Sequence, residues 1–286
     1  MQIIDGKATS AAIRQELREQ TAAFVKNNGF APGLAVILVG EDPASQVYVR
    51  NKARACEEVG FYSEVHRLPE NTKQEELFAL IDRLNAAENI HGILVQLPLP
   101  KHLNETELLL RISPEKDVDS FHPYNVGKLT IGNPAFLPCT PAGIMELLNR
   151  YGIDPDGKQC VVVGRSNIVG KPMALLLMAA NGTVTVCHRH TRDTNALTRE
   201  ADILVSAVGR AHFVTPDMVK EGAVVIDVGM NRDENGKLCG DVDFDTVAPK
   251  CSYITPVPGG VGPMTITMLL KNTLKSAEMK AQNQTC

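Results

Sequence analysis

Short apolar runs alternate with longer amphipathic segments along most of the chain. The run "GLAVILVG" (Gly33–Gly40) shows no alternation of apolar and polar positions, which is typical of a strand covered on both faces. Pro43 and Gly60 mark the ends of the amphipathic segment that follows, because proline favours the start of a helix and glycine its end. Strands are expected at 33–40, 61–68, 91–100, 160–164, 183–187, 202–208 and 223–229. Helices are expected at 7–28, 43–59, 73–88, 141–151, 170–180, 194–200, 215–220 and 264–281.

Residues 111–141 interrupt this alternation and divide it into two halves. The segment is rich in Pro, Gly, Asn and Asp, and a loop this long is usually functional or a domain junction. The first half is a small βαβαβ unit. In the second half, parallel strands joined by helices predict a right-handed, doubly wound Rossmann-type sheet. The predicted fold class is therefore α/β.

The composition favours a soluble protein of the cytoplasm. The 286 residues carry a net charge of −4, whereas wide contact with nucleic acid needs a basic face. No apolar run approaches the ~20 residues that span a bilayer, and no basic segment followed by an apolar stretch opens the chain. We expect neither nucleic acid nor a membrane as a partner.

The seven cysteines are widely spaced and include no C-x-x-C pair. An odd number at such spacings predicts neither a disulfide framework nor a structural zinc site. Cys160 and Cys187 lie in apolar strand runs and are expected to be buried.

The segment "GRSNIVG" (Gly164–Gly170) follows a predicted strand and opens a helix, at the edge of the sheet where α/β proteins bind ligands. Free N–H groups and the helix dipole suit a pyrophosphate there. Gly164 permits a tight turn and Gly170 permits close helix packing. Ser166 stands where a glycine usually lets pyrophosphate approach, and its hydroxyl could bind phosphate. A turn that binds nothing is the alternative.

The next strand, "TVTVC", ends in His188-Arg189-His190, without the acid that usually holds the ribose 2′-hydroxyl of NAD. A carboxylate would repel a 2′-phosphate, whereas Arg165, Arg189 and His190 would attract one. The sequence therefore favours NADP over NAD. His188 and His190 share one strand face, but no further ligand pattern accompanies them, and we predict no metal.

A second constellation lies in the first half of the chain. Tyr48 and Lys52 are four residues apart and share one face of a predicted helix. Gln96 interrupts an apolar strand near its carboxyl end, a position that favours a pocket. The alternatives are a solvated lysine, a tyrosine in the core and a glutamine that is a satisfied core polar group.

Two acidic runs admit less specific interpretations. Asp117 and Asp119 lie in the long loop, where most aspartates form turns. Asp241, Asp243 and Asp245 resemble a calcium ladder, but the glycine and the final glutamate of an EF-hand loop are missing. We interpret that run as the polar entry to a short element.

Nine sequence blocks occur in order over nearly the whole chain: QVYVRNK, GILVQLPLP, PEKDVDSFHPYNVGKL, PCTPAGI, GRSNIVGKPMA, TVTVCH, VVIDVGMN, GDVDF and TPVPGGVGPMT. In this order they resemble the bifunctional methylenetetrahydrofolate dehydrogenase/cyclohydrolase family. The length of the chain is similar to that of the bacterial bifunctional form.

The resemblance implies roles on the folate side. Tyr48 would stack on the pterin, Lys52 would be the catalytic lysine, and Gln96 would orient that lysine. Asp119 would hold the amino-pyrimidine edge of the pterin. The loop residues Pro258 and Gly259 would shape the folate side of a cleft.

On the cofactor side, the resemblance implies that Arg165, Ser166 and Arg189 bind the phosphates of NADP, at the turn formed by Gly164 and Gly170 and beside His190. It implies two α/β domains with a cleft between them. The folate-binding catalytic domain would comprise 1–140 plus 265–286, and the Rossmann domain 141–264. The family also implies a homodimer paired through the cofactor domain.

The implied activity is the NADP-dependent oxidation of 5,10-methylenetetrahydrofolate and the hydrolysis of the methenyl product to 10-formyltetrahydrofolate. Ring opening needs a base, and we expect Lys52 to act as an uncharged acid/base residue. The alternatives are another two-domain NADP enzyme, such as a shikimate-type or amino-acid dehydrogenase, and a non-catalytic NADP-binding regulator. The chain departs from the family pattern at Ser120, at Arg210-Ala211-His212 and at Met230.

Overall fold

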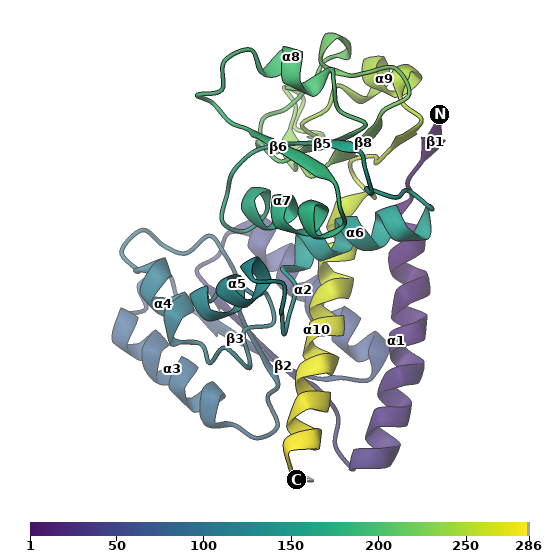
Figure 1. Ribbon diagram of the computed structural model, residues 1–286. Coiled ribbons are helices and arrows are strands. Elements are labelled where there is room, and N and C mark those ends of the chain that lie inside the picture. Colours follow the sequence, from purple (N-terminus) through teal and green to yellow (C-terminus); the bar gives the residue numbers. More distant parts are fainter. Residues whose placement is uncertain (285–286) are drawn as a thin grey trace. The chain divides into compact units, whose positions relative to one another are not determined.

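Parallel strands and their connecting helices form two units in the computed structural model of the chain (Figure 1), which describes residues 1–284. The three-stranded unit contains Ala12–Leu137 and the residues from Ile266 onward. The six-stranded unit contains Met1–Ala11 and Pro138–Thr265. The first eleven residues group with the second sheet because its edge strand β1 lies among them, whereas the limits predicted from the sequence counted them with the first domain.

The three-stranded sheet has the order β3-β2-β4, and both pairings are parallel. All seven residues of its central strand are buried, which confirms the prediction from the unbroken apolar run. The strands are β2 (Gly33–Val39), β3 (Tyr62–Leu68) and β4 (Gly92–Val95). The helices are α2 (Pro43–Val59), α3 (Gln74–Ala86), α4 (Glu105–Arg111) and α5 (Pro123–Thr130). Helices α1 (Gly6–Asn28) and α10 (Val261–Gln284) have residues in both units.

Helix α2 begins and ends where its sequence predicts. The side chain of Asp42 accepts a hydrogen bond from the N–H of Ser45 at 2.7 Å, and Pro43 occupies the first turn. Gly60 ends the helix with φ +81°, a left-handed conformation that only glycine adopts without strain. Asp42 and Pro43 fix the residue at which the helix starts, and Gly60 fixes where it ends. Tyr48 and Lys52 lie between these caps, on one face of the helix.

The six-stranded sheet is parallel throughout, with the order β1-β11-β8-β7-β5-β6. Strand β5 has β6 on one side and β7 on the other, so the strand order reverses beside it. The strands are β1 (Gln2–Ile3), β5 (Gln159–Val163), β6 (Thr183–Cys187), β7 (Ile203–Ser206), β8 (Val224–Asp227) and β11 (Tyr253–Ile254), with a separate pair β9 (Asn231–Arg232) and β10 (Leu238–Cys239). The helices are α6 (Cys139–Arg150), α7 (Gly170–Ala179), α8 (Thr194–Thr198) and α9 (Phe244–Val247), with 3₁₀ turns η1 (Pro216–Met218) and η2 (Ala248–Lys250).

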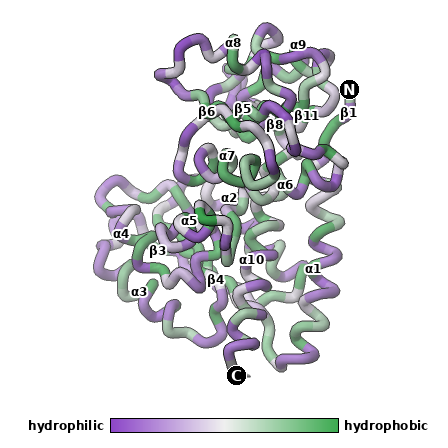
Figure 2. Tube along the Cα trace, in the orientation of Figure 1, coloured by the Kyte–Doolittle hydropathy of each residue, from purple (hydrophilic) through white to green (hydrophobic). Residues whose placement is uncertain are grey.

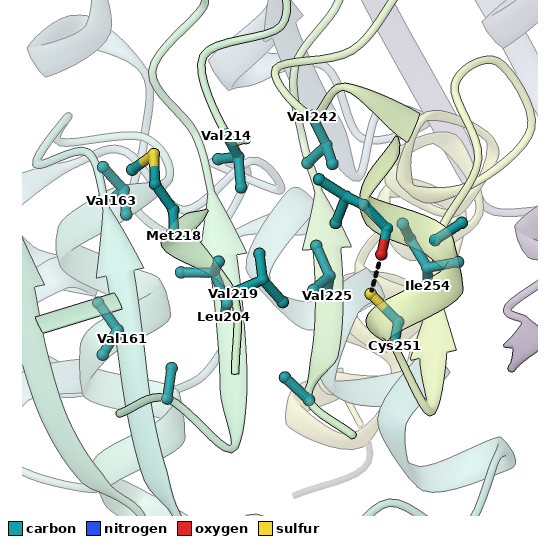
Figure 3. Close-up of a cluster of buried hydrophobic side chains, with 14 of the residues drawn as sticks. Val161, Val163, Leu204, Val214, Met218, Val219, Val225, Val242, Cys251 and Ile254 are labelled. Atoms are coloured by element: carbon teal, nitrogen blue, oxygen red, sulfur yellow. Dashed lines mark hydrogen bonds between the residues drawn. The ribbon is translucent and has the colours of Figure 1, made fainter. Parts of the chain in front are cut away.

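Apolar side chains cover both faces of the six-stranded sheet. On one face, alternate residues of neighbouring strands form a buried cluster, which includes Val161, Leu204 and Val225 (Figure 3). Within it, the thiol of Cys251 donates to the carbonyl of Val247 at 3.3 Å (Figure 3). Helix α7 packs against β5 and β6 and is hydrophobic along most of its length (Figure 2). This burial is typical of a parallel sheet between two layers of helices.

Two predicted elements differ in kind from the structure, and the strand expected at 91–100 is shortened to β4, Gly92–Val95. The segment 111–141, expected as a loop, contains helix α5, which buries Asn125 and Leu129. It starts at Pro123, and the ring of His122 accepts a hydrogen bond from the N–H of Tyr124 at 3.1 Å. The helix expected at 215–220 is the three-residue turn η1, because its next residue, Val219, is extended.

Cys160 and Cys187 are buried, as predicted. The cysteines within residues 1–284 are free thiols, and Cys286 lies outside the described residues. Over the same residues, none of the helices combines the length and apolar character that crossing a membrane requires. The cytoplasmic location stays a prediction.

His91 is a buried, uncharged base at the start of β4. The residue is 1% exposed, and its ring stacks on Phe30 with 5.3 Å between centroids. Its Nδ1 accepts a hydrogen bond from the N–H of Gly33 at 2.9 Å, which requires an unprotonated Nδ1. Burial, together with the charges of Lys280 and Lys116, lowers the pKa of His91 from 6.5 to about 4.

This lowered pKa predicts acid sensitivity of the fold. Between pH 6.5 and 4 the unfolded chain binds a proton at His91 that the folded chain does not, so stability falls as the pH falls through this window. The contribution is about 3 kcal/mol. His91→Asn keeps an acceptor for Gly33 but cannot titrate, so its free energy of unfolding should fall less steeply in urea titrations across this range. Equal slopes for the two proteins would contradict this expectation.

Candidate active site

A buried lysine and a glutamine meet in the three-stranded unit. Lys52, on α2, is 8% exposed, and its Nζ donates to Oε1 of Gln96 at 2.9 Å. Gln96 follows β4 directly, so it lies at the carboxyl end of that strand. Its own Nε2 donates to the carbonyl of Leu97 at 2.7 Å, which turns its amide oxygen toward the lysine. The structure thus brings together two residues 44 positions apart and excludes the alternative of a solvated lysine.

Tyr48 lies one turn before Lys52 on α2 and is half-buried. Burial raises the pKa of its phenol, so the ring is uncharged near neutral pH. Asp119, also half-buried, follows a segment that runs beside β4, where the carbonyl of Lys116 accepts from the N–H of Ile93 at 2.8 Å. An aromatic face, an amine and a carboxylate therefore belong to the same unit.

The neighbouring acid, Asp117, forms a turn, as the sequence analysis expects of an aspartate in this loop. It is 3% exposed and accepts hydrogen bonds from the N–H groups of Phe121 and His122, at 3.2 and 2.8 Å, and from the amide of Asn125. It therefore closes the loop that carries Asp119. Ser120, within this loop, has φ +61°, which explains why glycine is the easier residue at that position.

The predicted dinucleotide turn lies between β5 and α7 of the six-stranded unit. Gly164 has φ +123°, and a Cβ there would overlap the carbonyl oxygen of Ala207. A Cβ on Gly170 would overlap the carbonyl oxygen of Gly164. Both positions therefore require glycine, because no side chain fits where the strand, the turn and the helix approach one another.

Ser166 and Arg165 lie on the exposed part of this turn. The Ser166 Oγ accepts from the N–H groups of Val169 and Gly170 at 3.2 and 3.3 Å, at the start of α7. A hydroxyl has two acceptor positions and one donor, so its O–H can still donate to a phosphate oxygen. The hydroxyl of Ser166 can thus bind an anion at the N-terminus of α7, although this position lacks the usual glycine.

Basic side chains follow the adjacent strand. The register pairs Val163 of β5 with Cys187 of β6, so the ends of the two strands lie side by side. The exposed residues Arg189 and His190 come next, and Nε of Arg189 donates to Nε2 of His190 at 3.1 Å. This bond uses only the Nε–H of the guanidinium, and guanidinium N–H groups suit a phosphate.

Pro258 and Gly259 follow β11, at the same carboxyl edge of the six-stranded sheet. Gly259 has φ +102°, and its carbonyl accepts from the N–H of Lys7 at 2.9 Å. Residues 1–284 contain no group of three or more His, Cys, Asp or Glu side chains that could hold a metal ion.

A cavity of about 300 Å³ lies at the opposite edge of this sheet, near the amino ends of β7, β8 and β11. Its charged lining includes Lys220 and Asp202, which form an ion pair with each other at 2.6 Å. Ligands of α/β sheets bind at the carboxyl edge, so this cavity is not the candidate site.

A glycine turn on a doubly wound sheet and a buried amine on a second α/β unit define a two-unit enzyme of the dinucleotide-dependent class. The chain belongs to the tetrahydrofolate dehydrogenase/cyclohydrolase family. Residues 4–119 match the model of the family's catalytic domain, and residues 138–281 match that of its NAD(P)-binding domain.

Individual relatives agree with this assignment. The Bifunctional protein FolD of Streptococcus pneumoniae is 62% identical over 276 residues, which cover 96% of this chain and 97% of the relative. The FolD methylenetetrahydrofolate dehydrogenase/cyclohydrolase of Campylobacter jejuni matches with a TM-score of 0.95 and 56% identity, over 98% of this chain and 99% of that chain. The Trypanosoma brucei enzyme, solved with NADP cofactor and inhibitor, matches with a TM-score of 0.94 and 45% identity over 97% of both chains.

The contact of Gly164 with Ala207 gives a testable prediction. Gly164→Ala should lower the free energy of unfolding by about 2–3 kcal/mol, because the Cβ adds a backbone overlap to the strain of positive φ. Gly157→Ala is the matched control, since Gly157 has φ +68° but no atom within 4 Å of a Cβ, and it should cost only about 1 kcal/mol. If both variants lost the same free energy of unfolding in urea denaturation, the contact with Ala207 would not contribute to the cost of Gly164→Ala.

Proposed function

We propose that this chain oxidises 5,10-methylenetetrahydrofolate with NADP⁺ and then hydrolyses the methenyl product to 10-formyltetrahydrofolate, with Lys52 as the acid/base residue of the hydrolysis. Membership of the family supports the two activities. The hydrogen bond of 2.9 Å between Nζ of Lys52 and Oε1 of Gln96 is the observation that supports the role of the lysine.

Hydrolysis requires a base that removes a proton from water while the methenyl group carries a positive charge. An ammonium ion would oppose that cation, so we propose that Lys52 reacts as the neutral amine. Burial favours this form, because removing a charge from water is costly. The neutral Nζ has a lone pair for the proton of the attacking water, and it returns that proton to the ring nitrogen as the C–N bond breaks. The hydroxyl proton of the adduct leaves to solvent as the formyl C=O forms, so the cation and water give a neutral product and one released proton.

Gln96 suits this role better than a carboxylate would. Its amide oxygen accepts from Nζ and holds the amine in place without adding a negative charge. A glutamate at the same distance would stabilise the ammonium form of Lys52 and remove the base. Gln96 therefore orients the lysine and keeps it available for proton transfer.

Tyr48 and Asp119 are proposed to bind the folate. The uncharged Tyr48 ring offers a flat apolar face for the pterin, and the Asp119 carboxylate can accept from an amino-pyrimidine edge. Contact of Pro258 and Gly259 with the folate stays a prediction.

NADP⁺ supplies the acceptor for the hydride that leaves the methylene carbon, and this step needs positioning rather than an acid. We propose that Gly164, Ser166 and Gly170 hold the pyrophosphate at the N-terminus of α7. Arg165, Arg189 and His190 would hold the 2′-phosphate, beside the end of β6.

One assay tests both activities. The protein is incubated with methylenetetrahydrofolate and NADP⁺, and the absorbance of the methenyl product is recorded before and after acid treatment, which converts formyl product back to methenyl. Methenyl formation that does not depend on NADP⁺ would remove the cofactor assignment.

Lys52→Met should reduce the cyclohydrolase rate by ~10²–10⁴-fold, the usual contribution of general acid–base catalysis, and should affect hydride transfer less. Gln96→Glu should impair the same step. Lys26→Met, on the exposed last turn of α1, removes a lysine from the surface of the same unit and should leave both rates unchanged. Full cyclohydrolase activity in Lys52→Met would disprove the assignment.

We also infer that the protein forms a homodimer through the six-stranded unit. Strand β6 is an edge strand whose Val186 is 37% exposed, and the neighbouring helix α7 exposes Met178.

Light scattering should give twice the chain mass of 31.0 kDa, and Val186→Lys should give monomers. Ile131→Lys, which changes an exposed side chain of the other unit, should remain dimeric. A monomeric unmodified protein would overturn this inference.

A further inference from the structure

Two buried carboxylates at the carboxyl edge of the six-stranded sheet have no part in the function described so far. Asp227 is the last residue of β8 and is 3% exposed, and Asp241 is fully buried. The N–H of Asp241 donates to Asp227 at 2.9 Å, so the two are adjacent. Burial raises the pKa of Asp227 to about 6 against the opposing hydrogen bonds from the N–H groups of Val242, Asp241 and Gly229.

The side chain of Asp241 accepts hydrogen bonds from both loops that follow β7 and β8, and so connects them. It accepts five hydrogen bonds, and three of them come from consecutive backbone N–H groups in the loop after β7. The donors are Val208 N (2.7 Å), Gly209 N (3.3 Å) and Ser206 Oγ (3.2 Å) to one oxygen, and Arg210 N (2.9 Å) and Asn231 Nδ2 (3.0 Å) to the other. Successive N–H groups that converge in this way form an anion-binding concavity, which here is filled by the protein's own carboxylate.

This loop also touches the dinucleotide turn. The N–H of Ala207 donates to the carbonyl of Val163 at 2.8 Å, and Gly164 lies so close to the carbonyl of Ala207 that no side chain fits. The loop therefore lies directly beside the turn, at the carboxyl ends of β5 and β7.

The sheet order shows which part of a dinucleotide this loop meets. In a doubly wound sheet, the ribose 2′ position is read at the end of the second strand, which is β6 here. The other half of the dinucleotide lies on the opposite side of the switch point, above β7. The loop after β7 is thus on the nicotinamide side.

We propose that Asp241 is a positioning residue for the nicotinamide half of NADP, because its carboxylate fixes the backbone of residues 208–210 on which that half rests. This proposal depends on the proposed dinucleotide site at Gly164. An asparagine could not replace the aspartate, since its amide nitrogen would face N–H donors in place of an acceptor.

The test is Asp241→Asn, with calorimetric titration of two ligands: NADP⁺, and adenosine 2′,5′-bisphosphate, which carries only the adenine half and the 2′-phosphate. The Kd of NADP⁺ should rise roughly tenfold or more, because buried donors lose their acceptor. The Kd of the bisphosphate should stay unchanged. Hydrogen exchange of the amides of residues 208–210 should become faster, since each donates to Asp241 in the unmodified protein.

Three further variants make the result specific. Asp245→Asn makes the same change at an exposed position of the same acidic run and should bind both ligands normally. Arg189→Ala should weaken both ligands, because both carry the 2′-phosphate. Ser206→Ala removes a single donor to Asp241 and should give a smaller, equally selective loss for NADP⁺, which tests the proposal if Asp241→Asn does not fold.

Normal NADP⁺ binding by Asp241→Asn, or an equal loss of both ligands, would overturn the proposal while the dinucleotide site itself stands. If the unmodified protein bound neither ligand, the site and the proposal would fail together.

Discussion

Backbone N–H groups in the loops beyond the carboxyl ends of parallel strands have no sheet partner, yet when buried they must be hydrogen-bonded. Buried carboxylates meet this requirement in both units of the chain. Asp117 accepts from two N–H groups in the three-stranded unit, and Asp241 from three in the six-stranded unit. Since α/β sheets bind their ligands at this same edge, the groups that satisfy the backbone also set the shape of the sites.

Both units bury side chains that can carry charge, and each is held by hydrogen bonds. In the three-stranded unit, the buried Lys52 donates from Nζ to the amide oxygen of Gln96. Asp227 and Asp241 are buried against each other, and a negative pair of this kind is tolerated only because N–H groups surround it. Glycines give these carboxylates their space, because a Cβ on Gly229 would overlap Asp241 and one on Gly240 would overlap Asp227.

The sequence predicted those features whose signals are local. The apolar run of β2, the caps of α2 and the glycine turn were recognised because each depends on neighbouring residues. The meeting of Lys52 and Gln96 was expected from one helix face and one strand end, with the family resemblance to join them. Strands β1 and β11 were missed because two residues are too few for a period, and their pairing depends on residues about 250 positions apart. Helix α5 was missed because its surroundings have the composition of a loop.

The acidic motifs show why roles within a site are harder to predict than its position. The sequence contains D-V-D twice, as Asp117-Val118-Asp119 and as Asp241-Val242-Asp243. In both, the first acid and the valine are buried while the second acid is half-exposed. From the sequence spacing alone, the two aspartates of each motif could have either role. They differ because the first side chain points toward the loop whose N–H groups need acceptors, and that loop follows the motif in one case and lies about 30 residues before it in the other. The tertiary structure therefore decides which acid holds a loop and which acid can meet a ligand. Substitution of the first acid should change the shape of a site that its side chain does not touch.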